Sequence, residues 1–468
     1  MKAKVSKTYL VFIAVLTAIA ATVALTSCQT GGESSSQRTT AVASAATQDE
    51  AAAATLPEGS GSAKLTESDI AVNETIENAE DGGHAIVADG ETLSYANVRV
   101  NKTGEADGDE ADFYGENAAV FAANGGTLTL KDMVVKTDGT HANAVFSYGE
   151  GTTVNIANAY IETSGNCSGG LMTTGGGTMN AENLTINTSG NSSAAIRSDR
   201  GGGTVNVTGG NYTTSGTGSP VIYSTADITV SDATMTSTAS QGVVVEGKNA
   251  VTLNNVNLTA DNNKKNSDKS SRYQAVMIYQ SMSGDAAEGA SRFAMNGGTL
   301  TNQNGDVFFI NNTATEITLN NAQITNNGNG VFLRAAAAGW GSEGSNGGQV
   351  TLNASNQIIN GDMIVDSVSH LNLYLSNNAS FTGAINSSGQ DGEVYVEIED
   401  GSTWTLTGDS YITGMTCGAN AINLNGHKLF IDGTSYTEGS ASFGDPIAVQ
   451  STGNGHGGGN PPAKPEND

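Results

Sequence analysis

Short runs of alternating apolar and polar residues recur along most of the chain. A twelve-residue pattern, two apolar-x-apolar runs joined by a polar corner, begins at Leu128, Val154, Met179, Val205, Ile228, Val251, Phe293 and Ile317. Successive copies start 23 to 26 residues apart, except for one interval of 42. A third apolar run follows each copy, for example at Val145. Because period-two alternation is typical of strands with one buried face, each repeat predicts three short strands.

A repeat of this length indicates a solenoid, in which each unit buries its apolar face only against its neighbours. Equivalent apolar residues then form columns, and the repeat starts named above are the first column. Neighbouring rungs should lie about 4.8 Å apart, and the rule for crossover connections favours a right-handed coil. We therefore expect an all-β fold: a single right-handed parallel β-helix of about a dozen rungs, with disordered N- and C-terminal segments.

The residues that point outward from the third strand form a second pattern. Along the repeats they are Val87, Phe121, Phe146, Met172, Arg197, Ile222, Val244, Met277, Phe308, Phe332 and Ile364, a set that we call the third-strand outer face. Ten of these eleven residues are apolar, and the exception is Arg197. A monomer seldom exposes so long an apolar patch. We expect either a surface for binding or self-association, or a face that insertions or the segment before Ile70 cover.

Insertions interrupt the repeats at residues 105–116, 262–272, 281–291 and 335–348. The first two fall between the second and third strands, and the other two follow the third strand. Insertions on one flank of a solenoid usually mark its working face. Three of the four belong to the rungs that begin at Val251 and Ile317, so they should lie close together.

The insertion at 262–272 carries the densest basic cluster of the chain. The candidate binding residues are Lys264, Lys265, Arg272, Tyr273, Tyr279 and Trp340. Aromatic faces stack on sugar rings and cations pair with carboxylates, so these residues favour an acidic-glycan site. The alternative is a solvated loop without a ligand.

The insertion at 105–116 is acidic. Asp107, Asp109, Glu110 and Asp112 lie within six residues, and hard cations such as Ca²⁺ prefer oxygen ligands. The loop lacks the twelve-residue EF-hand pattern, so a solvated charge cluster is the alternative to a Ca²⁺ site. No other cofactor is indicated.

Sequence signals for catalysis are few. We find no stacked pair of Asp residues of the kind a β-helix hydrolase needs, and the five His residues show no metal-ligand spacing. Asp199-Arg200 at a turn is the nearest candidate. Cys167 and Cys417 are about nine rungs apart, roughly 40 Å at the strand spacing, and cannot bridge each other. Whether the chain is an enzyme stays uncertain, and the balance is against it.

The first 28 residues predict export and lipidation. Lys2, Lys4 and Lys7 precede an apolar run at 9–25, which ends in Leu25-Thr26-Ser27-Cys28. This resembles a bacterial lipobox, in which Cys28 is acylated and becomes the mature N-terminus. The predicted organisation is a signal peptide at 1–28, a flexible Ser/Thr/Ala-rich tether at 29–66, a β-helix at 67–450 and a Gly/Pro-rich tail at 451–468. We expect the protein to be anchored to a bacterial membrane, facing the cell surface or the periplasm.

The formal net charge of -27 argues against nucleic-acid partners, because such a surface repels phosphates. Membrane lipid, through Cys28, is the expected partner, together with a glycan, a surface protein or a second copy of the chain.

The repeats resemble the pectate-lyase-like right-handed parallel β-helix superfamily over about residues 70–435. The late segment INLNGHKLFIDG at 422–433 is typical of adhesin-like bacterial surface proteins with this fold. The resemblance implies the fold but not the function, since this scaffold carries lyases, glycosidases, adhesins and stalks. We expect a non-enzymatic, adhesin-like or glycan- or protein-binding surface lipoprotein. The alternatives are a lyase or glycoside hydrolase acting on an anionic polysaccharide, and a structural stalk.

Overall fold

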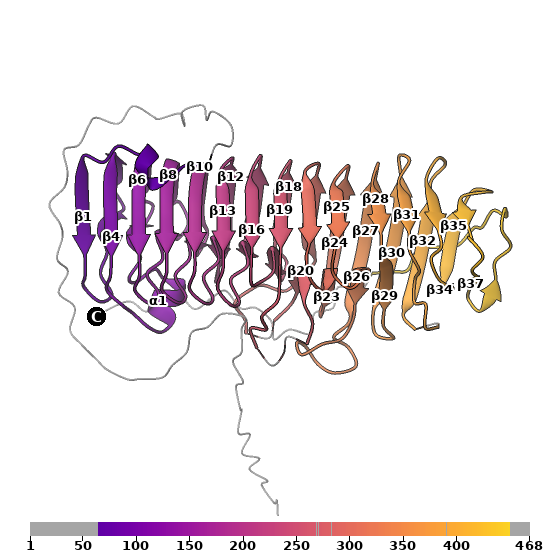
Figure 1. Ribbon diagram of the computed structural model, residues 1–468. Coiled ribbons are helices and arrows are strands. Elements are labelled where there is room, and N and C mark those ends of the chain that lie inside the picture. The colour runs from indigo at the N-terminus through magenta and orange to yellow at the C-terminus, as the bar shows by residue number, and fades with distance from the viewer. Residues whose placement is uncertain (1–63, 268, 270, 282, 390, 450–468) are drawn as a thin grey trace, which may run out of the picture.

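The structure is a computed structural model that describes residues 64–449 apart from 268, 270, 282 and 390. It is an elongated stack of β-coils that runs from β1 (Glu74–Asn78) to β38 (Thr434–Ser435) (Figure 1). Strands of successive coils pair in parallel, which confirms the all-β solenoid predicted from the repeats. The predicted signal peptide, nearly all of the tether and the C-terminal tail lie outside the described residues.

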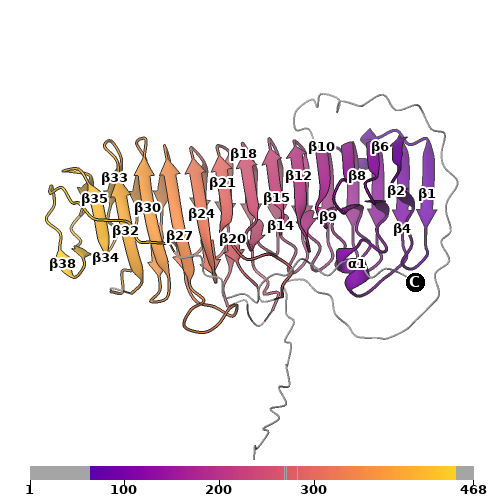
Figure 2. The same ribbon diagram turned by 180° about the vertical axis from the view of Figure 1, so that it is seen from behind.

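Three rows of strands run along the stack. The first row, seen in Figure 2, contains β3 (Thr92–Ala96), β6 (Thr127–Thr137), β8 (Thr153–Thr163), β10 (Gly177–Thr188), β12 (Gly203–Thr208), β15 (Asp227–Ser231), β18 (Ala250–Asn254), β21 (Ser291–Asn296), β24 (Thr313–Asn320), β27 (Gly348–Ser355), β30 (His370–Ser376), β32 (Glu393–Ile398) and β35 (Gly414–Cys417). The second row contains β1, β4 (Val98–Lys102), the later halves of β6, β8 and β10, β13 (Asn211–Thr214), β16 (Thr234–Ser237), β19 (Asn257–Ala260), β22 (Thr299–Asn302), β25 (Gln323–Asn326), β28 (Ile358–Asn360), β31 (Ser380–Thr382), β33 (Thr403–Thr405) and β36 (Ile422–Asn423).

The third row forms a separate sheet. It contains β2 (Ile86–Asp89), β5 (Val120–Ala123), β7 (Val145–Tyr148), β9 (Leu171–Thr174), β11 (Ile196–Ser198), β14 (Ile222–Ser224), β17 (Val243–Glu246), β20 (Gln274–Tyr279), β23 (Asp306–Asn311), β26 (Val331–Ala335) and β29 (Asp362–Val365). Near the C-terminal end, β34 (Ser410–Ile412), β37 (Leu429–Ile431) and β38 form a small sheet of their own. Among the described residues, the helices are η1 (Glu67–Asp69) and α1 (Asp109–Phe113).

A left-handed residue turns the chain from the first row into the second. Asn158 has φ 52° and Asn183 has φ 52°, and the side-chain amide of Asn183 donates to Asn158 over 2.8 Å. Asn, Asp and Gly tolerate this conformation better than other residues. The repeated polar corner of the sequence is therefore a stacked column of such residues.

The core lies inside the coil and follows the predicted first-row column. Leu128 pairs with Val154, Val154 with Met179, and each later member with the next as far as Ile317. All eight side chains are at most 1% exposed. Stacked apolar side chains that exclude water thus hold the coils together.

The predicted third-row alternation is wrong at three positions. Ile222 and Phe308 pair with core residues and point inward, and Phe332 also packs in the core. Tyr223 and Phe309 point outward in place of Ile222 and Phe308. All residues of β14 and β23 are buried, so both faces are covered there. A strand buried on both faces loses the alternation on which the prediction depends.

The insertions cover the third-strand outer face. Residues 105–116, which include α1, lie over Phe121, Phe146 and Met172, which are 8%, 0% and 0% exposed. Further along, Val244 and Met277 are 1% exposed and pack in one cluster with Trp340 of the insertion at 335–348. The insertions project on one flank of the stack (Figure 1). Most of the outer face is therefore buried within the protein and is not available for binding or self-association.

Candidate functional site

Two of the six predicted binding residues are not accessible. Tyr279 and Trp340 are 0% and 2% exposed, and their ring centroids lie 5.2 Å apart in an edge-to-face contact. The insertion that carries Trp340 is held down by Asn311, whose side-chain amide donates to the backbone of Ala336 and Asn346. These two rings pack the cover onto the coil and cannot stack on a sugar, so this part of the predicted site is wrong.

The remaining four residues lie on or beside the insertion at 262–272. Lys264, Lys265 and Arg272 are exposed, and Tyr273 is half-buried. Arg272 and Tyr273 line an open groove of about 350 Å³. Lys264 and Lys265 are not among the residues that line it. Of the six predicted binding residues, Arg272 and Tyr273 thus lie together at a groove.

The groove is formed by turns from three successive coils. Its walls include Gln303, Asn304, Asn327 and Asn329, from the turns that follow β22 and β25. The turns approach closely at Gly305, where a Cβ atom would lie 1.8 Å from the carbonyl oxygen of Tyr273. Gly305 also has φ 73°, a conformation that favours glycine.

Asp306 lies at the base of the groove. Its carboxylate accepts hydrogen bonds from Arg334 Nε and from the Asn329 side chain, both over 2.7 Å, and it is 1% exposed. Burial and the nearby charge of Arg334 lower the pKa of Arg272. The groove therefore presents amide groups and one guanidinium to solvent, while its carboxylate is already paired.

The acidic insertion does not gather its carboxylates around one point. Asp109 pairs with Arg200 at 2.9 Å on the surface. Asp112 is buried and points toward His141, and Asp107 lies 3.7 Å from the Nε2 atom of the same ring. Glu110 is a residue of α1, and its carbonyl oxygen accepts a hydrogen bond from the amide of Tyr114. This arrangement differs from the oxygen-only cage predicted for Ca²⁺ at Asp107, Asp109, Glu110 and Asp112.

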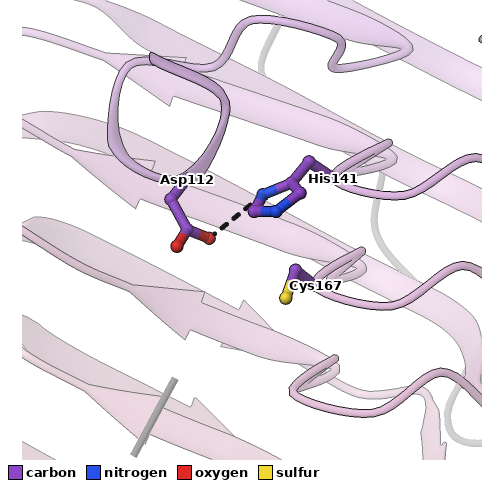
Figure 3. Close-up of side chains that lie close together, drawn as sticks. All are labelled: Asp112, His141 and Cys167. Atoms are coloured by element: carbon purple, nitrogen blue, oxygen red, sulfur yellow. Dashed lines mark ion pairs between the residues drawn. The ribbon is translucent and has the colours of Figure 1, made fainter. Parts of the chain in front are cut away.

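Beneath α1, the side chains of Asp112, His141 and Cys167 come together (Figure 3). One ligand atom from each residue lies within 4.8 Å of the others, and all three residues are buried. Asp112 Oδ1 is 3.2 Å from His141 Nδ1. His141 and Cys167 occupy the same position in successive turns, and each has φ 55°. The stacking of coils thus unites residues whose sequence spacing gives no metal pattern.

A buried ionic network continues from this group. Arg197 Nη2 lies 2.9 Å from Asp199 and 3.6 Å from Asp112. Arg200 pairs with Asp285 at 2.7 Å, and its guanidinium lies 3.6 Å from the ring centroid of Phe113 in α1. Burial raises the pKa of Asp199 to about 7, although Arg197 opposes the shift. The network joins α1 to the insertion at 281–291.

A second buried carboxyl lies under the same insertion. The hydroxyl groups of Tyr223 and Tyr279 both donate to Glu246 Oε2, the latter over 2.8 Å. Burial raises the pKa of Glu246. The pKa values of Tyr223 and Tyr279 are also raised, first by burial and second by the charge of Glu246. These groups are enclosed by protein, so a polymer cannot reach them in this conformation.

Sequence reasoning missed most of this network. His141, Asp285 and Glu246 are single polar residues in unrelated segments, and each meets its partner only through the folding of the coils and insertions. One signal was present: Arg197 interrupts an otherwise apolar outer face, and a charge in such a column indicates buried partners. The nearest catalytic candidate, Asp199-Arg200, proves to belong to this network.

Within the described part of the chain, no helix has the length and apolar character needed to span a membrane. Comparison of the chain with protein-family models, curated proteins and solved structures finds no match.

Proposed function

We propose that the protein is a glycan-binding surface lipoprotein, anchored through acylated Cys28 and built on a pectate-lyase-like β-helix. The groove beside Arg272 is the proposed binding site. Its amide side chains can donate to and accept from sugar hydroxyls, and Arg272 can pair with the carboxylate of a uronic acid. The half-buried ring of Tyr273 offers an apolar surface for a sugar ring.

One observation carries the choice of binding over cleavage. Hydrolysis of a glycosidic bond normally requires two carboxyl groups that flank it. Of the nine residues that line the groove, only Asp306 has a carboxylate, and that group is buried and paired with Arg334. A groove with one engaged carboxylate and many amides favours retention of a glycan without hydrolysis.

A lyase acting on an anionic polysaccharide is the second candidate, because Arg272 lines the groove in which a uronate would lie. A lyase removes the proton next to a uronate carboxyl, and a cation beside that carboxyl favours the removal. This activity would leave an unsaturated sugar, so one experiment separates the two candidates.

The experiment is calorimetry with a panel of uronate oligosaccharides (galacturonate, alginate, hyaluronan) and neutral ones (cello- and xylo-oligosaccharides). We expect uronate binding, and Arg272→Gln should weaken it about tenfold or more, since a hydrogen bond to a charged group contributes about 1.5–3 kcal/mol. Arg292→Gln is the matched control, because Arg292 is exposed on β21 outside the groove.

The same mixtures are examined for new reducing ends and for the absorbance of unsaturated sugars. Binding that is unaffected by Arg272→Gln, or no binding to any member of the panel, would contradict the proposed site. Unsaturated products would identify a lyase instead of a binding protein.

A further inference from the structure

The groove beside Arg272 offers a single cation to a ligand. Arg272 is exposed and has no ion pair within the described part of the chain, whereas Arg334 is paired with the buried carboxylate of Asp306 over 2.7 Å. Burial and Arg334 lower the pKa of Arg272, while the charges of Asp306 and Asp366 raise it, so these four groups lie near one another. Two arginines and two aspartates carry no net charge together. One carboxylate of a ligand can therefore pair with Arg272, and a second one would find no cation in the groove.

Two amide side chains that line the groove have a free carbonyl oxygen. The side-chain nitrogen of Asn304 donates to the carbonyl oxygen of Asn262 over 2.8 Å, and that of Asn327 donates to Gln303 Oε1 over 3.1 Å. These hydrogen bonds engage the nitrogen end of each amide. Asn304 Oδ1 and Asn327 Oδ1 have no hydrogen-bond partner among the described residues. Each oxygen is therefore available to a donor on a ligand.

The guanidinium and the amide oxygens select different sugars. An ionised carboxylate can only accept hydrogen bonds, so it pairs with Arg272 and finds no donor at Asn304 Oδ1 or Asn327 Oδ1. The hydroxyl groups of a neutral sugar, and the N–H of an acetamido group, do donate to such oxygens. A chain with a carboxylate on every sugar would place its second carboxylate beside acceptor oxygens, and this arrangement lowers affinity.

We propose that the ligand is a polysaccharide in which a uronic acid alternates with a neutral, hydroxyl- or acetamido-bearing sugar, and not a polymer of uronic acids alone. This inference rests on the proposed binding of a glycan in the groove. The uronate pairs with Arg272, and its neutral neighbour donates to Asn304 and Asn327. The groove is formed by turns of three successive coils, which span about 10 Å at the strand spacing, so consecutive sugars of one chain meet both kinds of group.

The test compares three tetrasaccharides by calorimetry with the full-length mature protein. They come from hyaluronan, with a carboxylate on every second sugar, from polygalacturonate, with one on every sugar, and from chitin, with none. Physiological ionic strength is used because it screens the exposed lysines outside the groove. We expect the hyaluronan tetrasaccharide to bind at least about tenfold more tightly than either of the others, since one hydrogen bond or ion pair contributes about that factor.

A charge-adding variant tests the reason for the preference. Asn327→Lys replaces an acceptor oxygen with a second cation at an exposed position of the groove. It should raise the affinity for the galacturonate tetrasaccharide about tenfold or more, because a hydrogen bond to a charged group is a strong one, and lower the affinity for the hyaluronan tetrasaccharide. Asn353→Lys is the matched control, because it adds the same charge on β27, outside the groove, and should leave the ratio of the two affinities unchanged.

The inference is overturned if wild-type protein binds the galacturonate or the chitin tetrasaccharide as tightly as the hyaluronan one. It is also overturned if Asn327→Lys, shown by thermal melting to be folded, keeps the wild-type ratio, or if Asn353→Lys changes that ratio equally. These results would leave glycan binding itself intact, because Arg272→Gln tests it separately. If no uronate oligosaccharide binds, the proposed function fails and this inference fails with it. The wild-type comparison decides the question even where a variant does not fold.

Discussion

Arg200 connects the insertion at 105–116, which covers part of the third-strand outer face, to the insertion at 281–291, so Arg200→Ala should loosen this cover. The arginine pairs with Asp285, which is 5% exposed, and with Asp109, which is 53% exposed. Its guanidinium also lies over the ring of Phe113. The coil beneath has its own core and does not need this contact, so we expect a local effect on the cover.

The expected magnitude follows from these three contacts. Breaking a fully buried ion pair costs about 3–5 kcal/mol, and the partial exposure of Arg200 reduces this to roughly 2–3 kcal/mol. The exposed pair with Asp109 adds about 0.2–1 kcal/mol, and the cation–π contact about 0.5–1 kcal/mol. Because such terms are not additive, we expect the opening free energy of the cover to fall by about 3 kcal/mol. That corresponds to about a 100-fold larger open population.

Hydrogen exchange measured by mass spectrometry gives the direct assay. Amides of peptides that span 105–116 should exchange roughly 100-fold faster in Arg200→Ala, while those of β15 and β18 should not change. An apolar dye should bind more strongly, because Phe146 and Met172 become accessible. Arg292→Ala is the control, since its ion pair with Asp227 is long, 3.8 Å, and exposed. Unchanged exchange at 105–116 together with unchanged dye binding would refute the idea that Arg200 holds the cover.

Further predictions concern the buried acid, the corner residues and the anchor. Because its pKa is raised, Glu246 binds a proton more tightly in the folded state than in the unfolded state. The protonated carboxyl therefore contributes to the free energy of unfolding below about pH 4.5, and this contribution is lost as the pH rises through the pKa of the folded state. The side chain of Glu246→Gln stays neutral at every pH. In urea unfolding, the free energy of unfolding of this variant should therefore increase relative to that of wild type from pH 4 to pH 7. Parallel pH profiles of the two proteins would contradict this. Asn158→Ala should lower the free energy of unfolding by about 1–2 kcal/mol, because alanine disfavours φ 52°. Asn158→Gly should lower it less, and equal urea midpoints for the two variants would contradict the strain argument. Cys28→Ser should release the protein from membranes into the aqueous phase of a detergent partition, and unchanged retention would exclude lipidation as the anchor.

The first two rows of the coil could be predicted from sequence because water contacts their outer face. There, alternation is preserved, and the column through Leu128 matches the observed pairing. The third row was harder, because the insertions bury its outer face as well. In β23, Val307, Phe308, Phe309 and Ile310 are all buried, so hydrophobicity no longer distinguishes the two faces.

The candidate sites show the same limit. Arg272 and Tyr273 could be located from sequence because they lie at the end of an insertion or directly after it, and insertions lie on the surface. Trp340 lies in an insertion too, but its apolar ring seals the loop onto the coil. His141 and Cys167 meet through the stacking of two turns, and Asp112 joins them only after α1 folds down. No local pattern records that arrangement.

Hydrogen exchange in the presence of the tightest-binding uronate oligosaccharide tests the proposed function most directly. We predict slower exchange in the turns at 303–306 and 327–329, and no change in β30 and β32. Saturating oligosaccharide that leaves both turns unchanged, or that protects a different part of the coil, would contradict glycan binding in this groove.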